Sequence, residues 1–243
     1  MNPPATVVKV LAETGPILFD FDGPVCGIFA RLNAHTVAAE LRRVLADAGV
    51  ALTLAASREA DPLAVLKWTA AHCPELVPRI DDELRRAELL AVATAHPTPY
   101  ATDAIMAAHR AERPIAIVSN NSEPAIQSYL ESHRLTRYIH TVTGRPYAEP
   151  DRMKPHPGPV LRAISALDAE PHTCVLVGDS PNDIHAARHA GARSIGYVNK
   201  PGKRRTLIRA GADAITNSTD GMAQLAAALG TLNFHTHGAR KSR

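Results

Sequence analysis

Pro16-Ile-Leu-Phe-Asp-Phe-Asp-Gly23 is a short apolar run that ends abruptly in polar residues and a glycine. A short run that stays apolar throughout is typical of a strand buried on both faces of a parallel sheet. Similar runs recur along the chain beside helical patterns, so the sequence predicts a doubly wound parallel α/β sheet. The expected strands are Pro16–Asp20, Pro114–Ser119, Thr173–Gly178 and Ser194–Val198, with weaker ones at Tyr138–Thr143 and Ala214–Thr216.

Residues 28–96 break this alternation, because they show helical periodicity and no strand-like run. Within them, Asp61-Pro62 is typical of the start of a helix. We therefore expect a helical cap of residues 28–96, inserted into an α/β core of residues 1–27 and 97–230. Such an insertion lies at the carboxyl edge of the sheet, where open α/β sheets bind their ligands, so the cap could act as a lid.

The charge of the chain gives little support to nucleic-acid binding. The 27 Lys and Arg residues against 24 Asp and Glu residues give a net charge of +3, and Arg240, Lys241 and Arg243 account for all of it. These three lie in residues 231–243, which we expect to form a disordered basic tail. Aromatic residues make up 4% of the chain, too few to suggest a base-stacking surface. No apolar run approaches the roughly 18 residues of a membrane span. We expect a cytoplasmic protein, monomeric or homodimeric, that binds neither nucleic acid nor membrane.

One internal stretch is strongly basic. Residues 184–212 contain seven Lys or Arg residues and no acidic one. We interpret the stretch as a solvated face that follows the fourth strand. The alternative is that part of it steers an anionic substrate toward the site.

Aspartates follow two of the expected strands. In an extended segment alternate side chains share a face, so Asp20 and Asp22 can point at one site while Phe21 packs the other way. Asp179 and Asp183 follow the strand that ends at residue 178, and their carboxylates should reach the same edge of the sheet. Carboxylates so close together repel one another unless a cation lies between them. Mg²⁺ is the natural choice, because the ligands are hard oxygens.

Ser119, Asn120 and Lys154 supply groups suited to an anion. Ser119 and Asn120 end the second strand, where a hydroxyl and the following backbone N–H groups can hold an anion near the start of a helix. Lys154 lies in a segment stiffened by Pro155 and Pro157. Singly these residues are typical of a helix cap or a solvated loop. Together they offer the hydroxyl, amides and fixed cation that a phosphoryl group requires.

In their order, these segments resemble the four motifs of the haloacid dehalogenase superfamily. The resemblance extends over residues 17–229, and the insertion looks like the helical cap of the phosphoglycolate-phosphatase-like group. Its most specific part is Lys154-Pro-His-Pro157, followed 25 residues after Lys154 by Asp179 within Gly178-Asp-Ser-Pro-Asn-Asp183. The resemblance implies a Mg²⁺-dependent phosphatase acting on a small phosphorylated metabolite, of the phosphoglycolate or sugar-phosphate type.

The same resemblance implies a role for each aspartate. Asp20 would be the catalytic nucleophile that forms an aspartyl-phosphate, and also a metal ligand. Asp22 would be the catalytic acid and base, with its backbone carbonyl on the metal. Asp179 would be the third metal ligand, and Asp183 would support the site.

Ser119, Asn120 and Lys154 would bind the phosphoryl group, and Lys154 would also act in catalysis by offsetting the charge of Asp20. The presence of Asp22 favours a phosphate ester over an organic halide as the substrate, because a halide ion leaves without needing a proton. Phosphonate-cleaving relatives need a cap lysine for a Schiff base, and Lys67 is the only lysine between residues 28 and 96. We interpret Lys67, on a predicted helix beside Trp68, as a solvated or packing residue instead.

Some alternatives stay open. The family usually has Thr or Val at the position of Pro24, which has no N–H and a fixed φ. This departure supports a non-catalytic binding protein as one rival interpretation. A phosphomutase on the same fold is the other, because the motifs do not separate it from a phosphatase. Six cap residues are candidates for substrate contact: Arg31, His35, Arg58, Trp68, His72 and Arg79.

Overall fold

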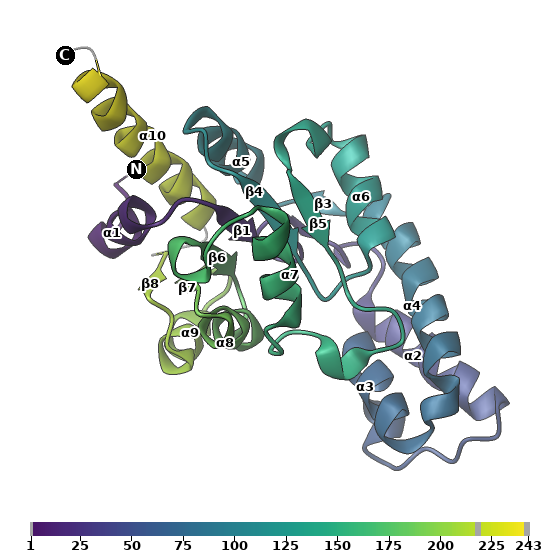
Figure 1. The fold of residues 1–243 in the computed structure, drawn as a ribbon. Helices are drawn as coiled ribbons and strands as arrows, with labels where there is room; N and C mark the ends of the chain where they lie inside the picture. The colour runs from purple at the N-terminus through teal and green to yellow at the C-terminus, as the bar shows by residue number, and fades with distance from the viewer. Residues whose placement is uncertain (1, 217–219, 241–243) are drawn as a thin grey trace.

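The centre of the protein is a six-stranded sheet whose paired strands are all parallel, in the order β5-β4-β1-β6-β7-β8. The computed structural model describes residues 2–216 and 220–240, with side chains up to residue 232. The doubly wound α/β fold expected from the sequence is confirmed (Figure 1). The strands are β1 (Ile17–Phe19), β4 (Ile115–Val118), β5 (Thr141–Thr143), β6 (Val175–Gly178), β7 (Arg193–Gly196) and β8 (Ala214–Ile215).

Helices cover both faces of this sheet, which explains why its strands are apolar at successive positions. In β1, Ile17 and Phe19 face one apolar layer while Leu18 faces the other. The first layer contains α1 (Ala5–Glu13), α5 (Ala101–Arg110), α6 (Glu123–Ser132) and α10 (Gly221–Arg240). The second contains α7 (Gly158–Ala166), α8 (Pro181–Ala190) and α9 (Lys203–Ala210).

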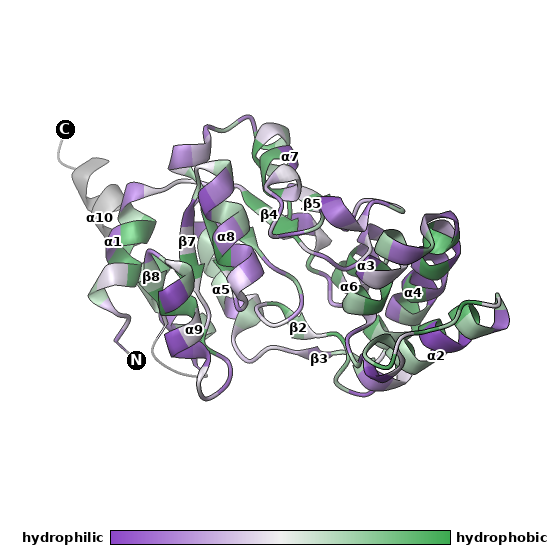
Figure 2. Ribbon diagram, turned by 90° about the horizontal axis from the view of Figure 1, so that it is seen from below, coloured by the Kyte–Doolittle hydropathy of each residue, from purple (hydrophilic) through white to green (hydrophobic). Residues whose placement is uncertain are grey.

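The insertion after β1 is a separate helical layer with its own apolar core. It consists of α2 (Ala34–Asp47), α3 (Pro62–His72) and α4 (Val77–Val92). Where this segment leaves and re-enters the core, β2 (Cys26–Gly27) and β3 (His96–Pro97) pair antiparallel. Figure 2 shows β2 and β3 between the sheet domain and the cap helices. These two short strands therefore form the double connection on which the cap is mounted.

Some elements differ from the sequence expectation. Helices α1 and α5 were not predicted, and both pack on the sheet. Residues 231–240, expected to be a disordered tail, continue the helical backbone of α10. Residues 241–243, the rest of that tail, lie outside the described residues.

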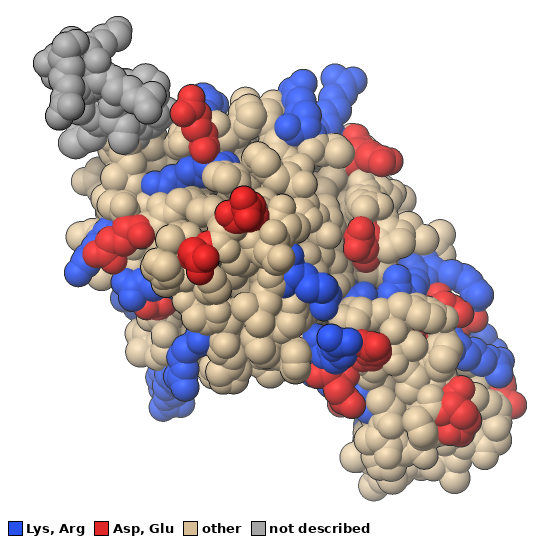
Figure 3. Space-filling view, in the orientation of Figure 1, with Lys and Arg blue, Asp and Glu red and all other residues tan. Residues whose placement is uncertain are grey.

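The surface carries charges of both signs. On the face seen in Figure 3, Lys and Arg side chains are interspersed with Asp and Glu side chains. In the described part of the chain, no helix combines the length and apolar character that a membrane crossing requires.

Candidate active site

The carboxyl ends of β1, β4 and β6 meet beneath the cap and bring together the residues predicted from the sequence. Because β1 lies between β4 and β6, Asp20 emerges between Ser119 and Asp179. A cavity of about 530 Å³ lies at this edge. All seven predicted residues line it: Asp20, Asp22, Ser119, Asn120, Lys154, Asp179 and Asp183.

The turn after β1 holds Asp22 and brings Asp179 close. Backbone N–H groups of Val25 and Cys26 donate to the carbonyl of Phe21, and that of Gly23 donates to Cys26. These bonds need no N–H at position 24, so the turn accommodates Pro24. A Cβ on Gly23, where φ is +110°, would lie 2.6 Å from Cγ of Asp179. Glycine is therefore required for this close approach.

Lys154 is the buried cation of the site. Its side chain is 2% exposed, and its Nζ lies 2.9 Å from Oδ1 of Asp20 and 2.6 Å from Oδ1 of Asp183. The ammonium also donates to the carbonyl of Val118, at 2.8 Å. Burial alone would lower the pKa of Lys154, but Asp183 and Asp20 raise it above its ordinary value. Lys154 is therefore charged at neutral pH and offsets part of the negative charge around it.

Asp183 is held in place as the third residue of α8. It forms a capping box with Ser180, accepting from the Ser180 backbone N–H at 3.0 Å and from its hydroxyl at 2.7 Å through Oδ2. The other oxygen, Oδ1, is thereby aimed at Lys154. A Cβ on Gly178 would lie 2.3 Å from Cβ of Asp183, so the end of β6 must be glycine for the helix to start here.

The side-chain amide of Asn120 joins the loop after β4 to the backbone of Lys154 through both its oxygen and its nitrogen. Asn120 accepts from the backbone N–H of Lys154 at 2.9 Å and donates to its carbonyl at 3.1 Å. The buried Ser119 hydroxyl donates to the Asn121 side chain and accepts from the Asn121 backbone N–H. The loop that follows β4 and the lysine segment are therefore one connected unit, although 34 residues separate Asn120 from Lys154.

The carboxylates suit a hard divalent cation. Oxygens of Asp20, Asp179 and Asp183 lie within 4.8 Å of one another. Burial raises the pKa of Asp20 to about 8, and repulsion from Asp183 adds to this effect despite the opposing Lys154. The positive charge of Lys154 therefore does not fully balance the burial and the negative charges around Asp20. A bound Mg²⁺ would supply the missing positive charge. The Asp22 side chain is not in this group of oxygens.

Asp22 occupies a different environment from Asp20. Its Oδ1 accepts from the backbone N–H of Ile28 at 3.0 Å, while part of the side chain stays open to the cavity. Loss of solvating water around the carboxyl group raises the pKa of Asp22 to about 6, although the hydrogen bond from Ile28 lowers it. Both protonation states are therefore accessible near neutrality, as acid and base catalysis requires.

Lys203 is a site residue that the sequence did not single out. Its ammonium contacts Oδ2 of Asp179, which also accepts from Asn199 at 2.7 Å. Lys203 was included only in the basic stretch 184–212, interpreted as a solvated face. That interpretation is incomplete, because the loop after β7 turns this lysine back onto Asp179. A second cavity of about 550 Å³ shares Asp22 and Asp179 with the first and is lined by Lys200 and Lys203.

The cap contributes residues that the sequence did not identify. Among the described residues that line the first cavity, none of the six proposed for substrate contact appears, and neither does Lys67. The signal that could have found Glu59 and Asp61 is their place directly before α3, whose start faces the cavity. The cap residues present are Phe29, Ala34, Glu59, Ala60, Asp61, Pro62, Leu63, Leu84 and Glu88.

This arrangement defines a class of doubly wound α/β proteins in which a strand-end aspartate faces a buried lysine beneath an inserted helical cap. Within that class, the chain belongs to the family described as haloacid dehalogenase-like hydrolase, which matches residues 17–191. The resemblance noted in the sequence is confirmed, and the protein is an enzyme of this hydrolase family.

Curated relatives include phosphoglycolate phosphatases. The enzyme of Salmonella paratyphi A is 36% identical over 100 residues, which are 41% of this chain and 39% of the relative. The enzyme of Escherichia coli K12 is 33% identical over the same extent. The matches thus span about two fifths of the length of these relatives.

Solved structures match over much more of the chain. A family hydrolase from Deinococcus radiodurans R1, determined with bound phosphate and sodium, is 26% identical. It has a TM-score of 0.58, and the match covers 89% of this chain and 97% of that one. CbbY from Rhodobacter sphaeroides, in complex with phosphate, is 21% identical with a TM-score of 0.63, over 86% and 99% of the two chains. At 21% identity, the match to CbbY shows a shared fold and nothing more.

Proposed function

We propose that this protein is a Mg²⁺-dependent phosphatase that hydrolyses a small phosphorylated metabolite of the phosphoglycolate or sugar-phosphate type. The observation that carries the proposal is the convergence of Asp20, Lys154, Ser119 and Asp22 on one cavity under the cap. The phosphoglycolate phosphatases among the relatives support the same class of reaction. A helical lid over the site favours a small substrate, because the lid keeps folded proteins from reaching the site.

In this proposal the Asp20 carboxylate attacks phosphorus and forms an aspartyl-phosphate, while Asp22 gives its proton to the departing alkoxide. The Asp22 carboxylate then takes a proton from the water that hydrolyses the aspartyl-phosphate, which releases inorganic phosphate and restores both aspartates. The different surroundings of the two carboxylates fit these different roles.

Lys154, Ser119 and Asn120 hold the phosphoryl oxygens in place. Lys154 offsets charge on both Asp20 and the phosphoryl group, because its ammonium is already 2.9 Å from Asp20. The Ser119 hydroxyl and the following backbone amides supply hydrogen-bond donors. Mg²⁺, held by Asp20, Asp179 and the backbone carbonyl of Asp22, would neutralise phosphoryl charge and orient the phosphoryl group.

Phosphate release from a panel of sugar phosphates, nucleotides, phosphoglycolate and phosphoamino acids, with Mg²⁺ and the Asp20→Asn variant as control, tests the proposal. Release without a bisphosphate activator favours a phosphatase over a phosphomutase. Equal inactivity of both proteins on the whole panel would leave the non-catalytic binding protein as the better interpretation.

The acid role of Asp22 predicts a dependence on the leaving group. In Asp22→Asn the amide oxygen still accepts from Ile28, so the turn is preserved, but the proton donor is lost. We expect kcat/KM for an alkyl phosphate, which reports the step in which the alkoxide leaves, to fall by about 10²- to 10⁴-fold. The loss of kcat/KM for p-nitrophenyl phosphate should be much smaller, because nitrophenolate leaves without a proton. Equal losses of kcat/KM on the two substrates, measured by phosphate release, would rule out the acid role.

The metal site predicts stabilisation by magnesium. At a Mg²⁺ concentration 100-fold above its Kd, the gain of about 2.7 kcal/mol should raise Tm by about 5–10 °C. Asp179→Asn removes a ligand charge and should reduce the shift to less than half. Asp103→Asn, an exposed carboxylate on α5, is the matched control and should respond like the wild type. A wild-type Tm insensitive to Mg²⁺ would refute the site.

The cap side of the cavity bears on which metabolite fits. Lys154 is the one Lys or Arg residue among the described residues that line it, whereas Glu59 and Asp61 add negative charge from the cap. A second carboxylate on the substrate would meet repulsion there. The lining therefore favours a sugar phosphate, with a neutral hydroxyl-bearing end, over phosphoglycolate.

Glu59→Gln tests this preference. Glu59 Oε1 accepts from the backbone N–H groups of Ala60 and Asp61, and a glutamine oxygen can replace it, so the loop should keep its shape. We expect kcat/KM for phosphoglycolate to rise about 3- to 10-fold relative to a sugar phosphate, as expected for removing one nearby like charge. Glu75→Gln, an exposed cap carboxylate outside the cavity, should leave the ratio unchanged. An unchanged ratio in Glu59→Gln would contradict the preference.

A further inference from the structure

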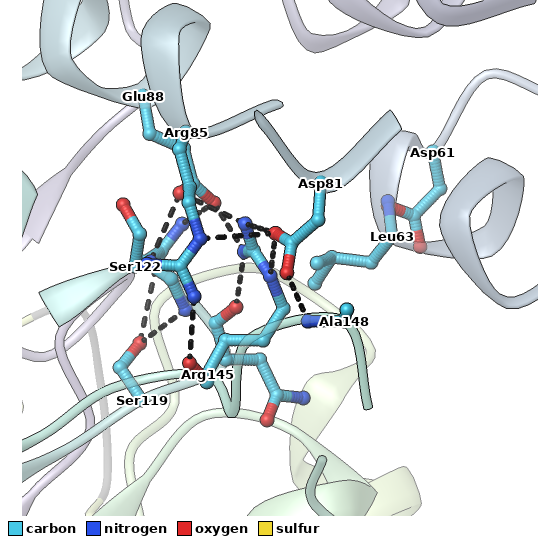
Figure 4. Close-up of polar contacts among 11 residues, drawn as sticks. Asp61, Leu63, Asp81, Arg85, Glu88, Ser119, Ser122, Arg145 and Ala148 are labelled. Carbon is cyan, nitrogen blue, oxygen red and sulfur yellow. Dashed lines mark hydrogen bonds and ion pairs between the residues drawn. The ribbon is translucent and has the colours of Figure 1, made fainter. Parts of the chain in front are cut away.

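A buried cluster of charged side chains joins the cap to the core beside the active site. Arg145, in the loop after β5, lies between Asp81 and Glu88 of cap helix α4 (Figure 4). All three side chains are at most 1% exposed. Even where buried charges are paired and hydrogen-bonded, the cost of removing them from water largely offsets their attraction, so the cluster adds little net stability. These residues therefore need a reason to be here beyond the stability of the cap.

The guanidinium of Arg145 is fully engaged. It donates to Oδ1 of Asp81 at 2.7 and 3.0 Å, and to Oε1 of Glu88 at 2.7 Å. Arg85 lies 3.3 Å from the same Asp81 oxygen, so two acidic and two basic groups balance. Glu88 lies seven positions, or about two helical turns, after Asp81, which places both carboxylates on one side of α4.

The cluster continues into the loop that would bind phosphate. Nη1 of Arg145 donates to the carbonyl of Asn120 at 2.8 Å. Glu88 accepts from the side chain of Asn121 at 3.3 Å and from the backbone N–H of Ser122 at 2.9 Å. Asn121 in turn exchanges hydrogen bonds with the Ser119 hydroxyl. A cap residue is thus two hydrogen bonds away from the serine of the phosphate site.

The two carboxylates have different partners. Asp81 bonds to Arg145 and to the backbone N–H of Ala148, in the segment after β5. Glu88 bonds to Arg145 and directly to the loop of residues 119–122, and it also lines the cavity. Asp81 therefore anchors Arg145, whereas Glu88 contacts the loop itself.

We propose that Glu88, clamped by Arg145, is a positioning residue of the cap that sets the shape of the phosphate-binding loop 119–122 and couples the position of the cap to phosphate binding. The part concerning phosphate rests on the proposed function. The part concerning the loop does not, because it rests on the bonds from Glu88 to Asn121 and Ser122. Any movement of α4 away from the core must break the Glu88 bonds to Asn121 and Ser122 and so disturb the loop.

The test compares Glu88→Gln with Asp81→Asn in the full-length protein. Each change replaces one buried carboxylate oxygen by an NH₂ group, so the two variants are closely matched in charge and burial. In ligand-free protein, we expect Glu88→Gln to speed hydrogen exchange of residues 119–122 by at least about 10-fold, and Asp81→Asn to do so far less. Similar rates in both variants, or a wild-type rate in Glu88→Gln, would overturn the proposal, because a purely structural role affects both alike.

The second readout is affinity for inorganic phosphate in the presence of Mg²⁺, measured by calorimetry. We expect Glu88→Gln to weaken binding about 10-fold and Asp81→Asn to change it less than 3-fold. Equal effects would refute the coupling. If Glu88→Gln does not fold, Glu88→Asp, which keeps the charge but is one methylene shorter, carries both measurements. If the wild-type protein bound no phosphate, the proposed function would fail, and exchange alone would decide the role of Glu88.

Discussion

Asp20→Asn should abolish turnover: we expect kcat for phosphate release to fall by about 10⁴-fold or more, as is typical when a covalent nucleophile is removed. An amide has nearly the same shape as a carboxylate but cannot form the aspartyl-phosphate. The measurement is phosphate release on the best substrate of the panel, with Mg²⁺ present. Residual turnover within about 10-fold of the wild type would refute Asp20 as the nucleophile.

The same variant should still fold, which separates lost chemistry from lost structure. The ordinary carboxyl pKa of 3.8 is raised to about 8 in Asp20 by burial and by repulsion from Asp183. A carboxyl whose pKa is raised by folding contributes stability below pH 4, and this contribution is lost as the pH rises through about 8. In EDTA at pH 7, Asp20→Asn should therefore unfold no earlier than the wild type, and its stability should depend less on pH between 4 and 8. Early unfolding would make its inactivity uninformative.

Lys154→Met should lose both activity and stability. We expect kcat/KM to fall by about 10²- to 10⁴-fold, because the preorganised cation that holds the phosphoryl oxygens is lost. Without the ammonium, Asp20 and Asp183 are left buried without their partner, which should lower the free energy of unfolding by roughly 3–5 kcal/mol. Phosphate release and urea denaturation in EDTA measure the two effects.

Lys67→Met is the control for Lys154→Met. Lys67 is the only lysine of the cap and does not line the cavity. Its removal should leave kcat/KM within 2-fold and the unfolding free energy within about 0.5 kcal/mol of the wild type. A large loss of activity in Lys67→Met would instead favour a phosphonate-cleaving enzyme with a lysine on its cap.

The strands were predictable because burial on both faces of a parallel sheet makes their composition unmistakable, as in Ile17–Phe19 and Val175–Gly178. The paired strands Cys26–Gly27 and His96–Pro97 were not, since two residues are too few to show a period. Helix α5 (Ala101–Arg110) was missed although its buried residues Ala101, Ala104, Ile105 and Ala108 recur at helical spacing.

The signal for Asp81 and Glu88 was present but easy to overlook. They lie among the apolar positions Ile80, Leu84 and Ala91 of α4, on the part of the helix that packs inward. A charged residue on a buried stripe implies a buried partner. The sequence does not say which partner, because Arg145 is 57 residues from Glu88 and belongs to another domain.

The sequence by itself determined the fold class and the seven candidate active-site residues, because each of them follows a buried strand or lies in a stiff segment, and both are local patterns. Only the tertiary structure placed Lys203 on Asp179, Glu59 in the cavity wall, and Arg145 between Asp81 and Glu88. The physical reason is that strand burial leaves a pattern along the chain, whereas no local pattern identifies the partner of a distant charged side chain. Such pairs are defined only when the cap and the loop after β7 come together with the edge of the sheet.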